Sequence, residues 1–426
     1  MNIAKLKIFL GVILYSVFIN ISYIYIIHPE FNYMGLIYKE VPLYILLIAT
    51  LLSLVPILFL PNSISRPSQV IVWILYLVII IPNTYVSLYT LYLDYINILF
   101  IQGVLIVNIL VLNLMCRLPR IKLPIIKIKL SVFVFLIICV SLVNYCYLFF
   151  VFGFRFNLGV FADISNAYDL REGFREAGTK LSMYLINWQS KVFNILLIAI
   201  GLVYRKKSLL VIALFGQLLL FMISGHKTFI FSFVFLIGLI YCLKNQGKNF
   251  GMKMTYCLLA LVASTLIIDQ LLQSTIFSTL FVRRFLIVPS HLTGLYFEFF
   301  SLNEKGYWAY SFLKGFFDYP YDVTPPFLIG YIYFHKINMS ANANLWADGF
   351  ANLGILGVFL VTFILGMILW VYDNLVGRKD IVLYGLFLGM ASIDLTNGSL
   401  FTVLITHGLI LVVLLAIFAP NVNNGK

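Results

Sequence analysis

The sequence predicts an all-α, polytopic membrane protein with about twelve transmembrane helices and a large outer loop, folded as one integral membrane domain over 1–426. Three observations support this. Of the residues, 62% are hydrophobic and 11% charged, whereas soluble domains are about 45–50% apolar and about 25% charged. The mean hydropathy is +1.02. Apolar runs of about 20 residues, the length that crosses a bilayer, recur along the chain. A soluble globular protein, a disordered chain and a secreted disulfide scaffold are excluded.

The apolar runs define the expected spans in order. Two are weaker than the rest, because 184–204 begins with the polar run 187–191 and 381–396 is short. Between the spans, two long segments remain, 153–183 and 273–351. The expected spans are 8–27, 41–60, 70–90, 95–115, 131–152, 184–204, 208–224, 228–243, 254–272, 352–372, 381–396 and 399–419.

The basic residues predict the orientation of these spans. With the amino terminus in the cytoplasm, the short inner loops carry most of the Lys and Arg, and the short outer loops carry only Lys39 and Lys227. Cytoplasmic loops are enriched in Lys and Arg, so the net charge of +13 needs no nucleic acid partner. Both termini are expected in the cytoplasm. The first span, preceded by Lys5 and Lys7 and lacking an A-x-A site, is expected to remain as an anchor.

The sequence carries no motif for a nucleotide or a metal. It has no G-x-x-x-x-G-K-[ST] and no G-x-G-x-x-G. Asp318 and Asp322 are the nearest approach to a metal-binding acidic pair, the outer histidines form no H-x-x-x-H pair, and the five cysteines lack C-x-x-C spacing. We therefore expect no cofactor and no metal, and neither an ATP-driven transporter nor a nucleotide-sugar transferase.

The two long outer segments are where function is expected, because long loops are uncommon and usually functional. Both mix charges with aromatic and apolar residues, which predicts short amphipathic or re-entrant helices on the outer membrane face. In 153–183, Arg171 and Arg175 are four residues apart and share one helix face. They form either a solvated face paired with its own glutamates or a two-arginine clamp for a phosphate or sugar.

The most distinctive stretch is FVRRFLIVPSHLTGLYFEFFS, 281–301. As a helix, it carries Arg284, His291 and Glu298 every seven residues along one face of an otherwise apolar and aromatic surface. Such a polar stripe suits a pocket wall that faces the bilayer. The alternative is an interfacial helix whose charges extend to the headgroups. Pro289 predicts a kink.

Other polar groups lie near the outer ends of spans. The turn SGHKT holds His226 and Lys227 between two apolar helices, where polar groups are costly unless satisfied. Asp348, in NANLWADGFANLG, is either a functional group or a helix cap. Asp394 is a functional candidate, and His407, inside the last span, is expected to pair with a neighbouring helix.

Three of these stretches resemble a known family. SGHKT, VRRFLIVPSHLTGLYFEFFS and the run from GYIYF to NANLWADGFANLGILG are similar to the oligosaccharide repeat unit polymerases, the Wzy-type O-antigen polymerases of bacteria. The resemblance covers residues 150–360 and the hydropathy plan. It implies a C-type glycosyltransferase-like fold in the bacterial inner membrane, with a periplasmic active site. Undecaprenyl-pyrophosphate-linked oligosaccharide repeat units would be joined there into O-antigen or a related surface polysaccharide.

The implied reaction gives the candidate residues roles. Departing pyrophosphate needs cations or donors near its oxygens, and the acceptor hydroxyl needs a base. The implied partners are the lipid-linked oligosaccharide, membrane lipid and a chain-length regulator protein. The available cations are Arg171, Arg175, Lys227, Arg283 and Arg284. The candidate bases are His291, Glu298 and Asp348.

Two other functions remain open. An O-antigen ligase uses the same donor on the same side of the membrane and differs in its acceptor, lipid A core. A flippase for the lipid-linked units is a transporter with a similar number of helices. It is expected to have short loops on both sides and polar residues spread through many helices. Here the polar residues cluster outside, which favours the polymerase.

Overall fold

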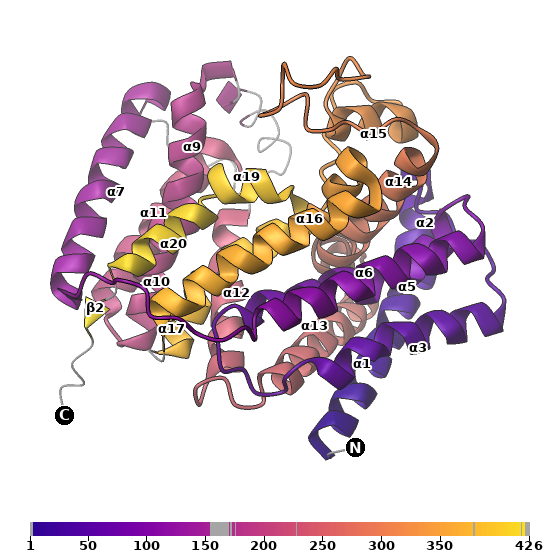
Figure 1. The fold of residues 1–426 in the computed structure, drawn as a ribbon, viewed down its shortest axis with the longest axis horizontal. Coiled ribbons are helices and arrows are strands. Elements are labelled where there is room, and N and C mark those ends of the chain that lie inside the picture. The colour runs from indigo at the N-terminus through magenta and orange to yellow at the C-terminus, as the bar shows by residue number, and fades with distance from the viewer. Residues whose placement is uncertain are drawn as a thin grey trace.

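The computed structural model describes residues 3–153, 170, 173–174, 176–226, 228–377, 380–418 and 420–421, and these are almost entirely helical (Figure 1). Four elements, η1, η3, η5 and η6, are π-helical, and η2 is a 3-10 turn. The elements of the first part are α1 (Ile3–Ser22), η1 (Tyr23–Ile27), α2 (His28–Phe31), η2 (Asn32–Met34), α3 (Leu43–Phe59), α4 (Gln69–Leu75), η3 (Tyr76–Ile80), α5 (Ile81–Thr90), α6 (Tyr95–Met115), β1 (Ile128–Lys129) and α7 (Leu130–Phe152).

The second part of the chain completes the bundle. Its strand β2 pairs in parallel with β1, with Ile128 opposite Pro420. The elements are α9 (Lys180–Trp188), η5 (Gln189–Phe193), α10 (Asn194–Val203), α11 (Lys207–Ser224), α12 (Thr228–Leu243), α13 (Phe250–Leu272), η6 (Ser278–Ile287), α14 (Val288–Leu302), α15 (Pro325–Phe334), α16 (Leu345–Val376), α17 (Ile381–Phe387), α18 (Gly389–Asn397), α19 (Leu400–Ile405), α20 (Leu409–Ile417) and β2 (Pro420–Asn421).

Within the described residues, nine helices are long and apolar enough to cross a membrane. All but one coincide with predicted spans, and the exception is Ser278–Leu302, which lies in the predicted outer segment 273–351. The nine are Ile3–Met34, Gln69–Thr90, Tyr95–Met115, Leu130–Phe152, Lys180–Val203, Lys207–Ser224, Phe250–Leu272, Ser278–Leu302 and Leu345–Val376.

The other predicted spans correspond to shorter helices. The helix α3 has 17 residues with Pro56 inside it, and α12 has 16 residues. The predicted span 381–396 is divided into α17 and α18 at Leu388, and 399–419 is divided into α19 and α20. The second division ends at Gly408, whose φ of +83° is a left-handed conformation that glycine adopts readily.

Although Ser278–Leu302 is long enough to cross a membrane, its two ends contact the same end of the bundle. The backbone N–H of Ser278 donates to the Asp269 carboxylate at the end of α13, 2.6 Å away. Twenty residues on, Glu298 accepts from the backbone N–H of Tyr92, in the connection after α5. Because α13 and α4 both begin beside the 60–68 connection, α13 and α5 end together at the opposite face. Residues near both ends of this helix are therefore bonded to connections at the same end of the bundle.

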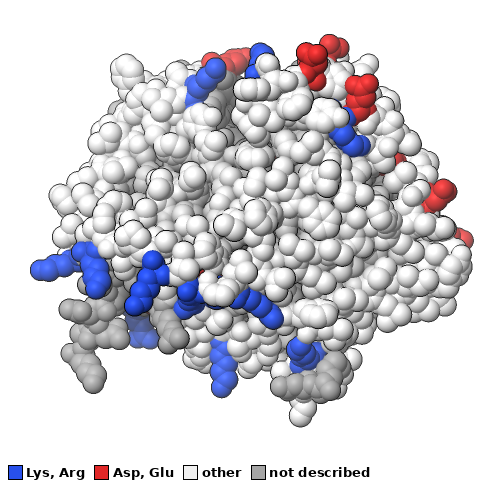
Figure 2. All heavy atoms as spheres, in the orientation of Figure 1, with Lys and Arg blue, Asp and Glu red and all other residues white. Residues whose placement is uncertain are grey.

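The surface of the bundle has two polar edges with an apolar flank between them. In Figure 2, Lys and Arg gather along the lower edge, where the chain begins, and Asp and Glu gather along the upper edge and rim, with a few Lys and Arg. Between these edges, large apolar side chains such as Phe135, Phe150 and Leu356 are exposed. A soluble monomer rarely exposes such a surface, and lipid chains cover it in a bilayer. The molecule is a polytopic membrane protein.

Candidate functional site

The π-helical element η6 changes which arginine faces the 31–39 segment. A π-helix closes its hydrogen bonds one residue later than an α-helix, so the register of the side chains is shifted. The Arg283 guanidinium lies 4.0 Å from the centre of the Phe31 ring, and its Nη1 is 3.6 Å from the Met34 sulfur. Arg284 is exposed. The seven-residue alignment predicted for Arg284 therefore does not form, and Arg283 takes its place.

His291 lies buried behind the same segment. Its ring is 4% exposed, and Nδ1 is 3.2 Å from the Thr90 hydroxyl. Nε2 has no hydrogen-bond partner among the described residues. Gly35, at a φ of +75°, covers this nitrogen so closely that a Cβ there would lie 3.3 Å from it. A buried polar atom without a partner is unusual. Nε2 faces the backbone of Gly35, where the lack of a side chain leaves room for the ring.

Glu298 lies further along α14 and has both carboxylate oxygens engaged. Oε2 accepts from the backbone N–H of Tyr92 at 2.6 Å, and Oε1 accepts from the Tyr333 hydroxyl of α15 at 3.1 Å. The side chain is buried. These bonds join α14 to the α5–α6 connection and to α15, so Glu298 fixes the relative positions of three elements.

Lys39 lies close to Glu298 and adds a cation beside it. From the sequence, Lys39 is only a charge in a short outer loop. Its Nζ donates to the Leu91 carbonyl at 2.8 Å and lies 3.7 Å from the centre of the Tyr92 ring. Partial burial lowers the pKa of Lys39, and the nearby Glu298 carboxylate opposes that shift. The sequence feature that could have identified Lys39 is the rarity of basic residues in the predicted short outer loops, which carry only Lys39 and Lys227.

We call Arg283, His291, Glu298 and Lys39 the α14 cluster. All four contact either the 31–39 segment or the connection after α5, and three of them come from η6 and α14. Two of the three candidate bases are therefore brought to one face.

Asp348 lies in a separate environment. Its Oδ2 accepts from the Trp308 indole N–H at 3.1 Å, and its Oδ1 accepts from the Tyr310 hydroxyl at 3.2 Å. Burial and the neighbouring carboxylate raise the pKa of Tyr310, so this phenol keeps its proton and donates. Asn352, one turn on, accepts from the Trp308 backbone N–H at 2.7 Å. Asp348 and Asn352 thus hold the 303–324 loop against α16.

The helix-cap alternative for Asp348 is wrong, because Asn344 is the cap. The Asn344 side chain accepts from the backbone N–H groups of Trp346 and Ala347, at 2.9 and 3.1 Å. The helix α16 is interrupted soon afterwards at Leu353 and Gly354, whose φ is +61°. This break lets the first turns of α16, which carry Asp348, depart from the direction of the rest of the helix.

Arg171, Arg175 and Lys227 lie outside the described residues. Next to Lys227, the His226 ring is stacked on Phe229, with ring centres 5.7 Å apart, and its Nδ1 is 2.9 Å from the Ser224 carbonyl. The His226 ring also contacts Phe174 edge to face, with ring centres 5.9 Å apart, so His226 joins its turn to the outer segment 153–183.

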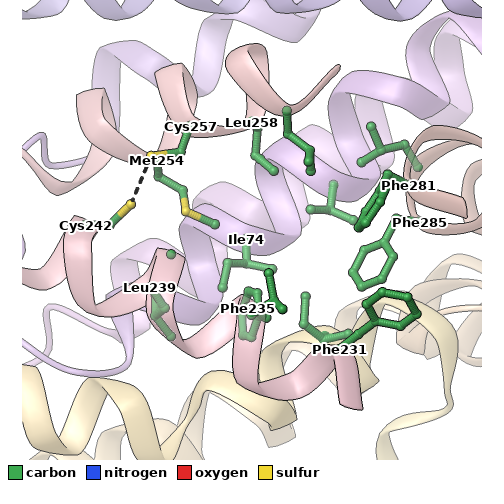
Figure 3. A pocket seen from close by; sticks show the side chains of 16 residues that line it. Ile74, Phe231, Phe235, Leu239, Cys242, Met254, Cys257, Leu258, Phe281 and Phe285 are labelled. Carbon is green, nitrogen blue, oxygen red and sulfur yellow. Dashed lines mark hydrogen bonds between the residues drawn. The ribbon is translucent and has the colours of Figure 1, made fainter. Parts of the chain in front are cut away.

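An apolar pocket of about 250 Å³ lies between η3, α12, α13 and η6 (Figure 3). Phe281 and Phe285 of η6 form one end, and Cys242 and Cys257, whose sulfurs are 3.8 Å apart, form the other. Val234, in its wall, is exposed. The pocket therefore opens on the apolar flank of the bundle.

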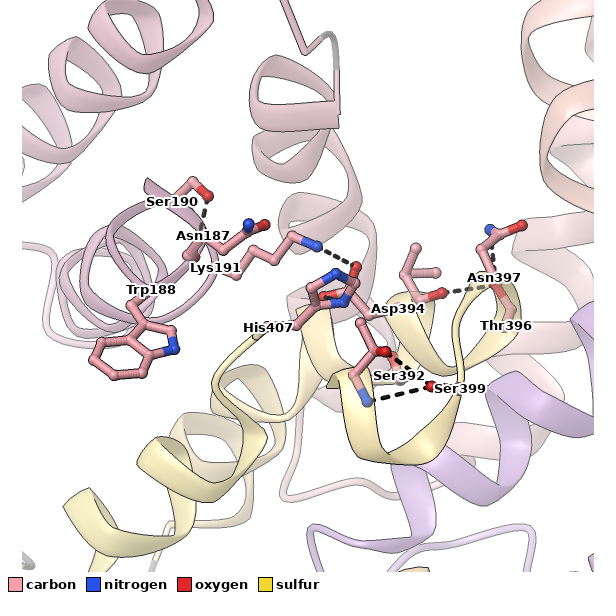
Figure 4. A network of polar contacts seen from close by, with 12 residues as sticks. Asn187, Trp188, Ser190, Lys191, Ser392, Asp394, Thr396, Asn397, Ser399 and His407 are labelled. Atoms are coloured by element: carbon pink, nitrogen blue, oxygen red, sulfur yellow. Dashed lines mark hydrogen bonds and ion pairs between the residues drawn. The ribbon is translucent and has the colours of Figure 1, made fainter. Parts of the chain in front are cut away.

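A second polar group lies among the helices around Lys180–Val203 (Figure 4). Lys191 Nζ is 2.8 Å from Asp394 Oδ1, and His407 Nδ1 is 3.4 Å from Asp394 Oδ2. The prediction that His407 pairs with a neighbouring helix is confirmed. Lys191 was not among the predicted site residues.

Beside Lys191, side-chain amides and hydroxyls form a connected chain of hydrogen bonds across α7, η5, α10, α11 and α12. Its members are Asn144, Tyr145, Gln189, Asn194, Gln217 and Ser232.

Across the described ranges, no group of three or more His, Cys, Asp or Glu side chains is arranged to hold a metal ion. Asp318 and Asp322, the pair considered from the sequence, are both exposed. No family model, curated protein or solved structure matches the chain in the comparisons with known proteins. The likeness to the repeat unit polymerases therefore stays a hypothesis, which the site must support through its own chemistry.

Proposed function

We propose that this protein is a glycosyltransferase of the polymerase type, which joins undecaprenyl-pyrophosphate-linked oligosaccharide units on the periplasmic face of a bacterial inner membrane. One observation carries the proposal: η6 belongs both to the α14 cluster and to the wall of the lateral apolar pocket. A single helix therefore presents cations and a base on one side and a lipid-accessible apolar surface on the other. This is the chemistry that a lipid-linked pyrophosphate donor requires.

The proposed orientation puts the basic edge in the cytoplasm and the acidic edge outside. This orientation is supported by Figure 2, in which Lys and Arg gather at one edge of the bundle, because cytoplasmic loops are enriched in Lys and Arg. With the shorter helices α3, α12, α17–α18 and α19–α20 counted as crossings and Ser278–Leu302 as re-entrant, the chain crosses the bilayer twelve times. Both termini are then cytoplasmic, and the C-type glycosyltransferase-like plan applies.

In this mechanism, the donor's isoprenoid chain occupies the apolar pocket and its pyrophosphate reaches the arginines of η6. Arg284 is exposed and adjoins the pocket residue Phe285 along η6, so Arg284 serves the bilayer side. Arg283 serves the α14 cluster. Guanidinium groups suit pyrophosphate because they bind two oxygens at once.

His291 is the favoured base. Glu298 already accepts two hydrogen bonds and Asp348 two others, whereas Nε2 of His291 has no partner among the described residues. The acceptor hydroxyl gives its proton to Nε2 while its oxygen bonds to the anomeric carbon. The bond from that carbon to the pyrophosphate oxygen breaks, and undecaprenyl pyrophosphate leaves. The 32–42 segment must move aside to admit the acceptor, because Gly35 covers Nε2.

The direct test is reconstitution of the full chain in liposomes with a synthetic undecaprenyl-pyrophosphate-linked oligosaccharide. A ladder of longer lipid-linked glycans on a gel is the expected product. A chain that is folded and inserted, yet forms no ladder with any lipid-linked repeat unit from its own host, would overturn the proposal. A product formed only when lipid A core is added would identify the ligase.

The pocket has its own test, with a matched control. Gly238 lines the pocket, and Gly103 lies in α6 away from it; a Cβ at either has no atom within 4 Å. Gly238→Phe fills the pocket and should raise KM for the lipid-linked donor at least tenfold, whereas Gly103→Phe should leave KM unchanged. Equal KM values for both variants would exclude the pocket as the site of the donor chain.

A flippase for lipid-linked oligosaccharides is the second candidate, because one specific observation favours it. The ion pair of Lys191 and Asp394 and the amide chain beside it extend polar groups through several helices, which was expected of a transporter. A fluorescent lipid-linked oligosaccharide placed in one leaflet distinguishes the two: a flippase makes it accessible from the other side without lengthening the glycan.

A further inference from the structure

Three interruptions of regular helix surround the three ionisable side chains of Lys191, Asp394 and His407. Lys191 lies in the π-helical element η5, and His407 lies in the break between α19 and α20. Asp394 lies within the short helix α18, between the division from α17 at Leu388 and the end of α18 at Asn397. π-helical turns and discontinuous transmembrane helices are concentrated at functional sites, and intramembrane ionisable residues are themselves functional candidates.

The geometry leaves one proton position open. Asp394 Oδ1 is satisfied by Lys191 Nζ at 2.8 Å, but Oδ2 and His407 Nδ1, 3.4 Å apart, each have no hydrogen-bond partner among the described residues. A carboxylate offers only acceptors, and an unprotonated ring nitrogen is also an acceptor. In the neutral tautomer that carries its proton on Nε2, two acceptors therefore face each other. A proton on Nδ1 would convert their contact into a charge-assisted hydrogen bond.

The neighbouring polar groups are already engaged and do not compete for this position. The Trp188 indole N–H donates to the Ile405 carbonyl at 2.8 Å, and the Asn187 amide donates to the Met183 carbonyl at 2.9 Å. The hydroxyls of Ser392 and Thr396 donate to carbonyls of their own helix. Figure 4 shows these side chains around the triad.

The charges that act on His407 are those of Asp394 and Lys191. Of the helices packed against the triad, α4, α10, α12, α19 and α20 contain no Asp, Glu, Lys, Arg or His, and α17 contributes only Tyr384. The helices α9 and α11, packed against η5, carry Lys180 and Lys207, which are exposed, and α7 carries Tyr145, which bonds Asn194. On α16, Asp348 is bound by Trp308 and Tyr310 at one end, and Asp373 is bound by Ser68 at the other.

We propose that Asp394 and His407 form an intramembrane proton-binding site, with Lys191 as its fixed counter-charge. The proton comes from water and bonds to Nδ1, so that neutral imidazole becomes imidazolium and nothing leaves; the His407 side chain is 20% exposed. A metal cation is disfavoured because the Lys191 ammonium already occupies the carboxylate. An anion is disfavoured because it would face Oδ2. The site stands independently of which glycan reaction the protein performs.

The test is ¹⁵N nuclear magnetic resonance of the full chain, labelled at histidine and held in nanodiscs, over pH 4–9. His407→Gln identifies the His407 signal, and exposed His335 is the internal control. The His407 signal should titrate within this range. Asp394→Asn should move its midpoint down by about one pH unit or more, because an anion is lost, and Lys191→Met should move it up, because a competing cation is lost. The His335 midpoint should not move.

The two opposite shifts exclude a merely structural role for these contacts. Asp394→Glu keeps the carboxylate and should restore titration if Asp394→Asn fails to insert. A His407 that stays neutral down to pH 4, or a midpoint that moves the same way or not at all in the two variants, would overturn the proposal.

Discussion

Replacing His291 by glutamine separates the base proposed for glycosyl transfer from the neighbouring carboxylate. The residue is 4% exposed, and among the described residues its ring bonds the Thr90 hydroxyl alone, through Nδ1. Glutamine keeps most of the volume and can still bond Thr90, but its amide does not accept a proton. Loss of a general base costs about 10²–10⁴ in rate, which is about 3–5 kcal/mol of transition-state stabilisation.

Glu298→Gln should behave differently. The amide oxygen can still accept from Tyr92, but the charge that accepts two hydrogen bonds and faces Lys39 is lost. Hydrogen bonds to charged groups contribute about 1.5–3 kcal/mol each, so this variant should melt at a clearly lower temperature. Its turnover should fall less than that of His291→Gln.

The assay is the initial rate of ladder formation with saturating lipid-linked donor, together with the melting temperature of each purified variant. His335→Gln is the matched control, because His335 is exposed in the same outer region. If His291→Gln is folded and polymerises at the wild-type rate, His291 is not the base. If Glu298→Gln loses more rate than His291→Gln at unchanged stability, the assignment of the base is reversed.

Three further predictions follow from the same contacts. Arg284→Lys keeps the charge but loses the planar guanidinium that binds two oxygens, so it should raise KM for the lipid-linked donor several-fold. Arg283→Lys should chiefly lower stability, because the guanidinium of Arg283 contacts the Phe31 ring. Equal effects of the two variants in donor titrations would contradict this division of roles. Tyr310→Phe removes a hydrogen bond to a buried carboxylate, at about 1.5–3 kcal/mol, and should speed proteolysis within 303–324; an unchanged cleavage rate would mean that this bond does not hold the loop. Reporter fusions at 118–127 should report the cytoplasm, and fusions at 303–324 the periplasm; a cytoplasmic signal from 303–324 would refute the mechanism.

The sequence determined the class of the protein and most of its helices. Whether about 20 residues enter a bilayer depends on their summed transfer free energy, which is a property of the segment itself. Hydropathy therefore found eight of the nine long apolar helices in the described part of the chain. It missed the length of Ser278–Leu302, because Arg283, Arg284 and His291 lower its hydropathy, although His291 is buried in the fold.

From the sequence, only those residues of the candidate site that lie on one helix could be predicted together. Spacing alone identified His291 and Glu298, but it aligned them with Arg284, because it assumed an uninterrupted α-helix. The π-helical turns of η6 shift the register of the side chains, which spacing along an assumed α-helix does not predict. Lys39 and Tyr92 join this cluster from connections more than two hundred residues earlier in the chain.

The intramembrane triad shows the same division. The sequence marked Asp394 and His407 as ionisable groups in apolar surroundings, which is sufficient to require partners for them. Lys191 lies 203 residues before Asp394, on a different helix. Periodicity describes the faces of one helix, and which faces meet is decided by the packing of all helices together. Only the tertiary structure therefore brings Lys191 and His407 each within 4 Å of the Asp394 carboxylate.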